Sequence, residues 1–329
     1  MKSGLLGGGC ELALCLISGL LAGCAQNAAD LVPATADRDP RLPQLSLTVA
    51  GHRRALHLET FGDEVNPVLL VYHGGEGSDY RALLPLQALS DRYFVVMWDA
   101  RGSGLSERIS REEVSEASYA DELHLVKEHF SPDRPATLLA YSSGGFHTAI
   151  ALRHYADDFS QLAFVEPDAF DAETRATTEL DVPVGAAWVN EYLWQNELIT
   201  PDDHELADFK LMTVLQPALA QISCDPAHPS DYPIWRLGAQ VRAEYARVFA
   251  ESDFRDGMAA HPNPVLIVAT GCGPLRASFQ RAHVAPVFRS ARVVELADGA
   301  DHLNVFDHAR EPLLAALRGF LSAYSAEAQ

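Results

Sequence analysis

The sequence is short of positive charge, and this shortage excludes one class of partner. Its 329 residues include 25 Lys and Arg against 45 Asp and Glu, which gives a formal net charge of −20. Because binding to a phosphate backbone needs clustered Lys and Arg, we expect no nucleic-acid partner. The 48% hydrophobic and 21% charged content predicts a packed globular protein rather than a disordered one.

Long apolar runs and repeated segments are also missing. Beyond the N-terminal region, no stretch approaches 18 consecutive apolar residues, which argues against a protein that crosses a membrane several times. The sequence shows no internal repeat, no metal-ligand cluster and no phosphate-cradling loop. We therefore expect no metal and no cofactor.

The N-terminus predicts export rather than a place in the fold. It has one early cation, Lys2, and an apolar run over 12–22 that is too short to span a bilayer. The run ends in "LAGC", which resembles the lipobox of bacterial lipoproteins. That resemblance implies a lipoprotein signal peptide over 1–23, a lipid on Cys24, a flexible tether over 24–44 and a membrane-anchored protein facing the periplasm. An ordinary secretory signal with a chance cysteine remains the alternative.

The cysteines are few, and their placement fits an exported protein. Of five, Cys10 and Cys15 leave with the signal, and Cys24 is the candidate for acylation. Cys224 and Cys272 remain, and an even pair outside the cytoplasm is a candidate disulfide. Two buried free thiols remain equally open, because the sequence does not show whether the two residues are close.

From residue 45 onward, strand-like and helical segments alternate. An opening hairpin is expected over 45–62, and continuous apolar runs such as 67–75 are typical of strands buried on both faces. This alternation predicts an α/β fold with a mostly parallel sheet and helices on both faces. It stops near Phe170 and resumes at Pro264, so we expect a core over 45–169 and 262–329 and a mainly helical cap insertion over 170–261.

The inserted segment holds three of the four tryptophans. An insertion late in a parallel sheet usually lies above the C-terminal edge of the strands, where ligands bind. Trp188, Trp194 and Trp235 are therefore candidate substrate contacts.

The stretch "AYSSGG" (140–145) joins an apolar strand-like run to a helical one. If one serine is a nucleophile on a tight strand-turn-helix elbow, the residues two before and two after it must be small. Ala140 and Gly144 meet this condition for Ser142, whereas Ser143 would have a tyrosine two residues before it. Ser142 is thus the candidate nucleophile, and the alternative is a helix cap rich in serine and glycine.

Three further motifs surround this elbow and carry a family resemblance. "HGGEG" (73–77), "WDARGSGLS" (98–106) and "GADH" (299–302) each follow a predicted strand. Their order resembles that of the α/β-hydrolase superfamily, and in particular the proline iminopeptidase branch of its serine hydrolases. The resemblance implies that Ser142 is the nucleophile and His302 the general base. It also implies an oxyanion hole formed by the backbone N–H groups of Gly75 and Ser143.

The acid of the expected triad is not at its usual place. Most members of the superfamily carry it just after the strand that corresponds to 264–271, but here "CGPLRASFQ" follows, without a carboxylate. Some branches carry the acid after the preceding strand, where this chain has Glu166, with Asp168 as the second candidate. Asp301 is a poor alternative, because a residue adjacent to His302 rarely reaches its ring.

These motifs predict a serine hydrolase that cleaves an ester or amide bond of a small molecule or short peptide. Glu76 stands where the family has proline, and it is a candidate contact for a cationic substrate group or a solvated loop carboxylate. Esterase and aminopeptidase activity remain open. The missing acid leaves a catalytically silent binding protein of the same fold as the alternative of a different class.

Overall fold

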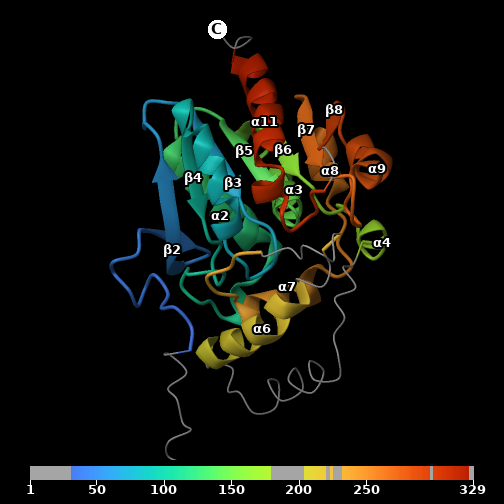
Figure 1. The fold of residues 1–329 in the computed structure, drawn as a ribbon. Coiled ribbons are helices and arrows are strands. Elements are labelled where there is room, and N and C mark those ends of the chain that lie inside the picture. Colours follow the sequence, from blue (N-terminus) through green and yellow to red (C-terminus); the bar gives the residue numbers. More distant parts are fainter. Residues whose placement is uncertain (1–30, 179–203, 220–222, 225–231, 297–298, 326–329) are drawn as a thin grey trace, which may run out of the picture.

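An eight-stranded sheet forms the centre of the molecule. A computed structural model describes residues 31–178, 204–219, 223–224, 232–296 and 299–325. The strands are β1 (Gln44–Val49), β2 (His52–Phe61), β3 (Val68–Tyr72), β4 (Phe94–Trp98), β5 (Ala136–Tyr141), β6 (Phe159–Val165), β7 (Val265–Ala269) and β8 (Ala291–Glu295). Figure 1 shows the sheet above a pair of helices that face one edge of it.

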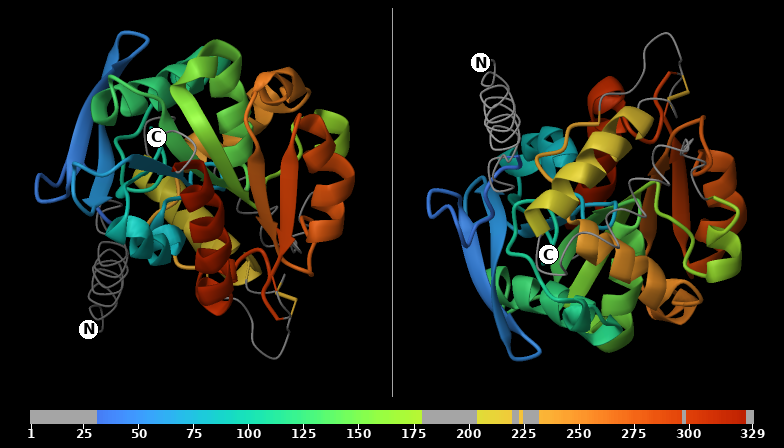
Figure 2. Two further views of the ribbon diagram at one scale, coloured as in Figure 1. Left: turned by 90° about the horizontal axis from the view of Figure 1, so that it is seen from above. Right: turned by 90° about the horizontal axis from the view of Figure 1, so that it is seen from below.

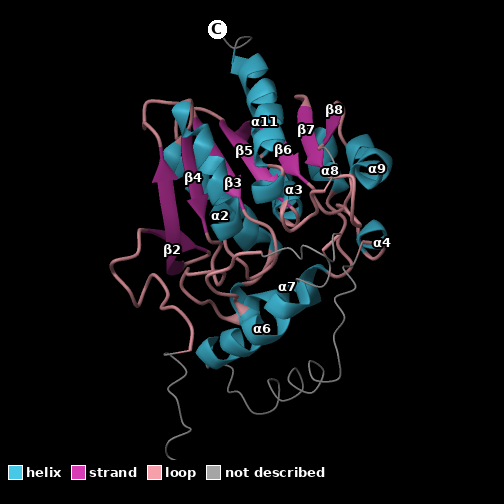
Figure 3. Cartoon of the chain, in the orientation of Figure 1, coloured by secondary structure: helices cyan, strands magenta, loops and turns pink. Residues whose placement is uncertain are grey.

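Helices connect the strands. The helices are α2 (Glu116–Phe130), α3 (Gly144–His154), α4 (Ala172–Arg175), α6 (His204–Leu219), α7 (Ala239–Phe249), α8 (Arg255–Ala260), α9 (Ala277–Phe279), α10 (Val305–His308) and α11 (Arg310–Ser325). Shorter or tighter helical segments are η2 (Arg81–Asp91), η3 (Arg111–Glu113), η4 (Ala156–Asp158), η6 (Gln280–Val284) and η7 (Ala285–Val287). Figure 3 separates these helices from the strands and loops by colour.

The sheet is mostly parallel, as the sequence predicts. Its strand order is β1-β2-β4-β3-β5-β6-β7-β8. Only the β1–β2 and β2–β4 pairs are antiparallel, and every pair from β4 to β8 is parallel. The β1–β2 hairpin turns on Ala50 and Gly51, whose φ angles of 50° and 84° suit a two-residue hairpin loop.

Both faces of the sheet are buried at its central strands. All residues of β3, β4, β5 and β7 are buried, which explains why their sequences are apolar apart from Thr137 in β5. One hydrophobic cluster joins a face of the sheet to α2, α3 and α8, and a second joins the other face to η2 and α11. Figure 2 shows these two helical layers on opposite sides of the sheet. The sheet therefore holds its strand ends rigidly in place for the site described below.

The inserted segment divides into two parts. Helices α6 and α7 lie beyond the C-terminal ends of the parallel strands, where a cap was expected (Figure 1). Helix α8 was assigned to the cap by the predicted boundary at residue 261, but it packs against α3 in the core layer. A Cβ at Gly257 would lie 2.4 Å from the carbonyl oxygen of Ala149, so glycine allows this close approach.

Residues 31–43 differ from the predicted flexible tether. Val32, Thr35 and Ala36 are buried. The Ala36 N–H donates to the Leu105 carbonyl at 2.7 Å, which fixes this segment on the domain. Cys24 and the predicted signal peptide lie outside the described residues. No helix in the described part of the chain combines the length and apolar character needed to cross a bilayer.

Candidate active site

Ser142 lies at a sharp turn between β5 and α3. Its φ angle is 52°, in the left-handed region that non-glycine residues rarely adopt. A Cβ at Gly144 would lie 2.6 Å from the His73 carbonyl oxygen, and one at Gly145 would lie 2.8 Å from the Pro167 Cβ. The turn is thus possible because both glycines lack side chains, as the elbow interpretation requires.

Ser142, His302 and Glu166 form a continuous hydrogen-bonded chain. The His302 Nε2 atom lies 3.0 Å from Ser142 Oγ, and its Nδ1 atom lies 2.8 Å from Glu166 Oε2. Because a carboxylate can only accept, Nδ1 carries the proton and Nε2 is the acceptor for the serine hydroxyl. The Glu166 side chain is fully buried, and His302 is 7% exposed. This arrangement can deprotonate Ser142.

Glu166 occupies the first position after β6, one strand before the usual place of the acid. Strands β6 and β7 are parallel neighbours, so their C-terminal ends meet at the same edge of the sheet. Thr270 follows β7, and both its N–H and its hydroxyl donate to Glu166 Oε1, at 2.7 and 2.5 Å. The usual acid position therefore holds a hydrogen-bond donor to the acid on the neighbouring strand.

The other two candidates for the triad acid have different partners. Asp168 accepts from the Ala169 N–H at 2.8 Å and from the Thr178 hydroxyl at 3.1 Å. Burial raises the pKa of Asp168 to about 6. Asp301 accepts from the Leu303 N–H in its own loop, at 3.0 Å. Of the three carboxylates that the sequence offers, the structure places Glu166 at the His302 ring.

The two predicted oxyanion donors line one cavity with Ser142. Gly75 has a φ angle of 72°, which favours glycine in this loop. Its N–H donates to the Ser143 hydroxyl at 2.9 Å, a contact that sequence reasoning missed. The Gly75 N–H, one of the two predicted oxyanion donors, is therefore bonded to the Ser143 side chain in this structure.

The cavity at the elbow has a volume of about 540 Å³. Its walls come from the loop after β3, from the loops that carry Ser142 and His302, and from helices α6 and α7. The contributions of the two helices include Leu215, Tyr245 and Phe249. Its charged lining residues are Glu76, Asp168, Arg175 and Arg242. The cavity is large enough for a small substrate beside Ser142.

Only one of the three tryptophans predicted to contact substrate lies among the described residues. Trp235 does not line the cavity, and this expectation was wrong. Its ring instead packs edge-on against His57 and Tyr80, and the Arg81 guanidinium lies over it. Trp188 and Trp194 lie outside the described residues.

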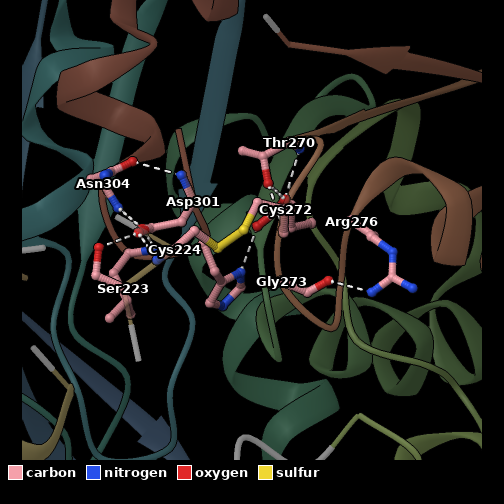
Figure 4. The surroundings of a disulfide bond; sticks show 11 residues. Ser223, Cys224, Thr270, Cys272, Gly273, Arg276, Asp301 and Asn304 are labelled. Carbon is pink, nitrogen blue, oxygen red and sulfur yellow. Dashed lines mark hydrogen bonds and ion pairs between the residues drawn. A yellow bond between two sulfur atoms is a disulfide. The ribbon is translucent and has the colours of Figure 1, made fainter. Parts of the chain in front are cut away.

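A disulfide joins Cys224 of the inserted segment to Cys272 of the loop after β7. Figure 4 shows that Asp301 lies beside this bond. The Asp301 carboxylate accepts from the Ser223 hydroxyl at 2.8 Å and from the Cys224 N–H at 3.1 Å. Residues 223–224 therefore connect the loop that carries Thr270 to the loop that carries His302.

Sequence reasoning also missed the role of Tyr141. Its buried hydroxyl donates to the carbonyl oxygen of His302, and its ring stacks on the imidazole with centroids 4.8 Å apart. Burial raises the pKa of Tyr141 well above its usual value, so this hydroxyl stays protonated. The residue before the elbow serine thus fixes the loop that presents the imidazole.

Residues 67–306 match the profile of the alpha/beta hydrolase fold family. The chain belongs to this family. A search of curated proteins finds no match to the chain. Membership in the alpha/beta hydrolase family supports hydrolase activity. The order of the strands in the sheet agrees with membership in this fold family.

The alignments with similar solved structures cover most of this chain and nearly all of each solved chain. A proline iminopeptidase-related protein from Thermus thermophilus is 18% identical, with 86% of this chain and 99% of that chain covered and a TM-score of 0.59. An esterase from Rhodococcus is 15% identical, with coverages of 85% and 98% and a TM-score of 0.57. An enol-lactonase from Burkholderia xenovorans is 18% identical, with coverages of 84% and 100% and a TM-score of 0.54. At these identities the similarity establishes the fold alone.

Proposed function

We propose that this alpha/beta hydrolase is a serine hydrolase that cleaves an ester or amide bond of a small substrate through Ser142, His302 and Glu166. The observation that carries the proposal is the position of the His302 ring, hydrogen-bonded to Ser142 on one side and to Glu166 on the other. The esterase and lactonase among the similar structures agree with this reaction class.

The mechanism follows from the donors and acceptors at these atoms. His302 Nε2 takes the Ser142 proton as Oγ attacks the carbonyl carbon, and Glu166 stabilises the imidazolium that forms. The backbone N–H groups of Gly75 and Ser143 bind the oxyanion. The imidazolium then protonates the leaving group, which departs and leaves an acyl-enzyme. Water, activated by the same imidazole, attacks the acyl-enzyme and releases the acid product.

The position of Glu166 argues against the alternative of a catalytically silent protein. That alternative was motivated by the absence of a carboxylate after β7. A buried carboxylate on the adjacent strand can fix the imidazole tautomer equally well, because what matters is an acceptor for Nδ1–H. The distance of 2.8 Å between the two groups supports this assignment.

An aminopeptidase acting on substrates with a free amine is the second candidate. Glu76 and Asp168 both line the cavity, and the charge of Glu76 contributes to the raised pKa of Asp168. A bound ammonium group would relieve this repulsion. The two arginines of the cavity already have backbone acceptors: Arg175 donates to the carbonyl oxygens of Phe249 and Ser252 at 3.1 and 3.0 Å, and Arg242 donates to the Glu76 carbonyl oxygen at 3.4 Å.

Export and lipid anchoring through Cys24 remain part of the proposal. They rest on the "LAGC" sequence at the end of the apolar N-terminal run. An anchored enzyme outside the cytoplasm would also be in a compartment where the Cys224–Cys272 disulfide persists.

The test compares Ser142→Ala with Ser143→Ala. Hydrolysis of short-chain p-nitrophenyl esters and of aminoacyl p-nitroanilides is measured for both variants and for the wild type. Ser142→Ala should lower turnover by on the order of 10⁶. Ser143→Ala keeps the backbone N–H and loses one side-chain acceptor, so it should change turnover by less than about tenfold. The reverse pattern would place the nucleophile at Ser143, and equal small effects would contradict a serine mechanism.

A further inference from the structure

We propose that Thr270 is a positioning residue for the triad, holding the Glu166 carboxylate turned toward His302. This inference rests on the proposed function, because it assigns Glu166 as the triad acid. It concerns a residue at the strand end where the family usually carries that acid.

The two carboxylate oxygens of Glu166 have different hydrogen-bond partners. Oε2 accepts from His302, and Oε1 accepts both from the Thr270 N–H and from the Thr270 hydroxyl. Rotation of the carboxylate away from the imidazole would therefore break three hydrogen bonds. Neither Glu166 nor Thr270 is exposed to solvent, so water does not replace these bonds.

The backbone around Thr270 is fixed from several directions. Glu166 donates its own N–H to the Val268 carbonyl at 2.9 Å, which extends the β6–β7 pairing to the acid. The Thr270 carbonyl accepts from the Ala277 N–H at 2.8 Å. The Thr270 hydroxyl also lies 3.0 Å from the Cys272 carbonyl oxygen. Thr270 thus presents its donors from a rigid strand end.

Two donors on one oxygen fix the orientation of a carboxylate, and charge-assisted hydrogen bonds of this kind are stronger than neutral ones. Loss of the Thr270 hydroxyl would remove one of the two donors that hold Glu166 Oε1. The carboxylate would then be held less firmly toward the His302 ring.

The test compares Thr270→Val with Thr270→Ser. Valine keeps the backbone N–H and removes the hydroxyl, whereas serine keeps both donors. Thr270→Val should lower kcat roughly 10- to 100-fold with little change in KM, because a misplaced catalytic group costs rate rather than substrate binding. Thr270→Ser should retain the wild-type kcat and KM.

Two results would overturn the proposal. One is a Thr270→Val enzyme with wild-type kcat. The other is a Thr270→Ser enzyme as impaired as Thr270→Val, which would show that activity does not follow the presence of the hydroxyl. If Thr270→Val does not give folded protein, as judged by thermal unfolding, Thr270→Ala is measured with the same two outcomes.

A double mutant separates this inference from the proposed function. In a Glu166→Gln background, Thr270→Val should cause a much smaller loss than in the wild type, because the two residues act through one interaction. A full additional loss would show that Thr270 does not act through Glu166. If Glu166→Gln alone has wild-type turnover, the acid assignment itself fails, whatever Thr270→Val does.

Discussion

Replacing Asp168 with Asn should stabilise the protein above pH 6. Burial raises the pKa of this carboxyl from 3.8 to about 6, and the nearby charge of Glu76 acts in the same direction. The N–H of Ala169 and the hydroxyl of Thr178 oppose the rise but do not cancel it. The folded protein therefore keeps this proton to a higher pH than the unfolded chain does.

The sign and size of the effect follow from this difference. Between pH 3.8 and about 6 the folded state binds more protons than the unfolded state, so the free energy of unfolding falls as the pH rises. At about 1.4 kcal/mol for each pH unit, the loss approaches about 3 kcal/mol and is complete above pH 6. Asn carries no charge and keeps an oxygen to accept from Ala169. At pH 8, Asp168→Asn should thus be more stable than wild type by up to about 3 kcal/mol.

The assay is urea unfolding of both proteins at a series of pH values from 4 to 8. The difference in the free energy of unfolding between variant and wild type should be near zero at pH 4. It should grow to its full size above pH 6. The exposed Asp157 provides a matched control, since Asp157→Asn should change stability by less than about 0.5 kcal/mol throughout. A variant that is less stable than wild type at pH 8, or a difference that does not vary with pH, would refute the reasoning.

Two remaining predictions concern the disulfide. Replacing Cys224 and Cys272 by Ser should lower the free energy of unfolding by about 4 kcal/mol, from the 48-residue separation of the two cysteines, measured by urea unfolding. Reducing the bond in the folded wild type should lower kcat, because residues 223–224 hold the loops of Thr270 and His302 together. The serine double variant should not respond to reductant, and an unchanged kcat in the reduced wild type would exclude the coupling.

The sheet could be predicted because its strands have a simple signature. Strands buried on both faces read as continuous apolar runs, and β3, β4, β5 and β7 all do so. The elbow could be placed because its turn tolerates only small neighbours, a constraint that Ala140 and Gly144 satisfy. Glu166 is the predicted acid because some branches of the superfamily carry the acid after the strand that precedes the usual one. In the structure its carboxylate lies 2.8 Å from His302 Nδ1.

The contacts that the sequence did not predict join residues that are far apart in the sequence. They depend on which way each side chain points in the folded protein. The Thr270 hydroxyl meets Glu166 only because β6 and β7 are neighbours with matched ends. The Ser143 hydroxyl accepts a hydrogen bond from the Gly75 N–H, although the two residues are 68 positions apart in the sequence. Trp235 was expected at the substrate, but it packs against Tyr80 instead, because composition does not reveal which way a ring turns.

The boundaries of the cap and the tether were missed for a related reason. An amphipathic helix has the same pattern whether it covers a substrate or the sheet, so α8 was assigned to the wrong layer. Residues 31–43 have the composition of a linker, yet Val32 and Ala36 are buried on the domain. Composition measures the average tendency of a segment, whereas a few buried side chains are enough to fix it in place.

The central claim is that Glu166 is the acid that serves His302, and turnover of two neighbouring variants tests it most directly. Glu166→Gln keeps the shape of the side chain but removes the charge that stabilises the imidazolium. Asp168→Asn makes the same kind of change two residues away, at a carboxyl that does not contact the ring. On any ester that the wild type accepts, Glu166→Gln should lower kcat by up to about 10⁴, while Asp168→Asn stays near wild type. The opposite pattern would make Asp168 the acid, and near-wild-type turnover in both variants would contradict a triad altogether.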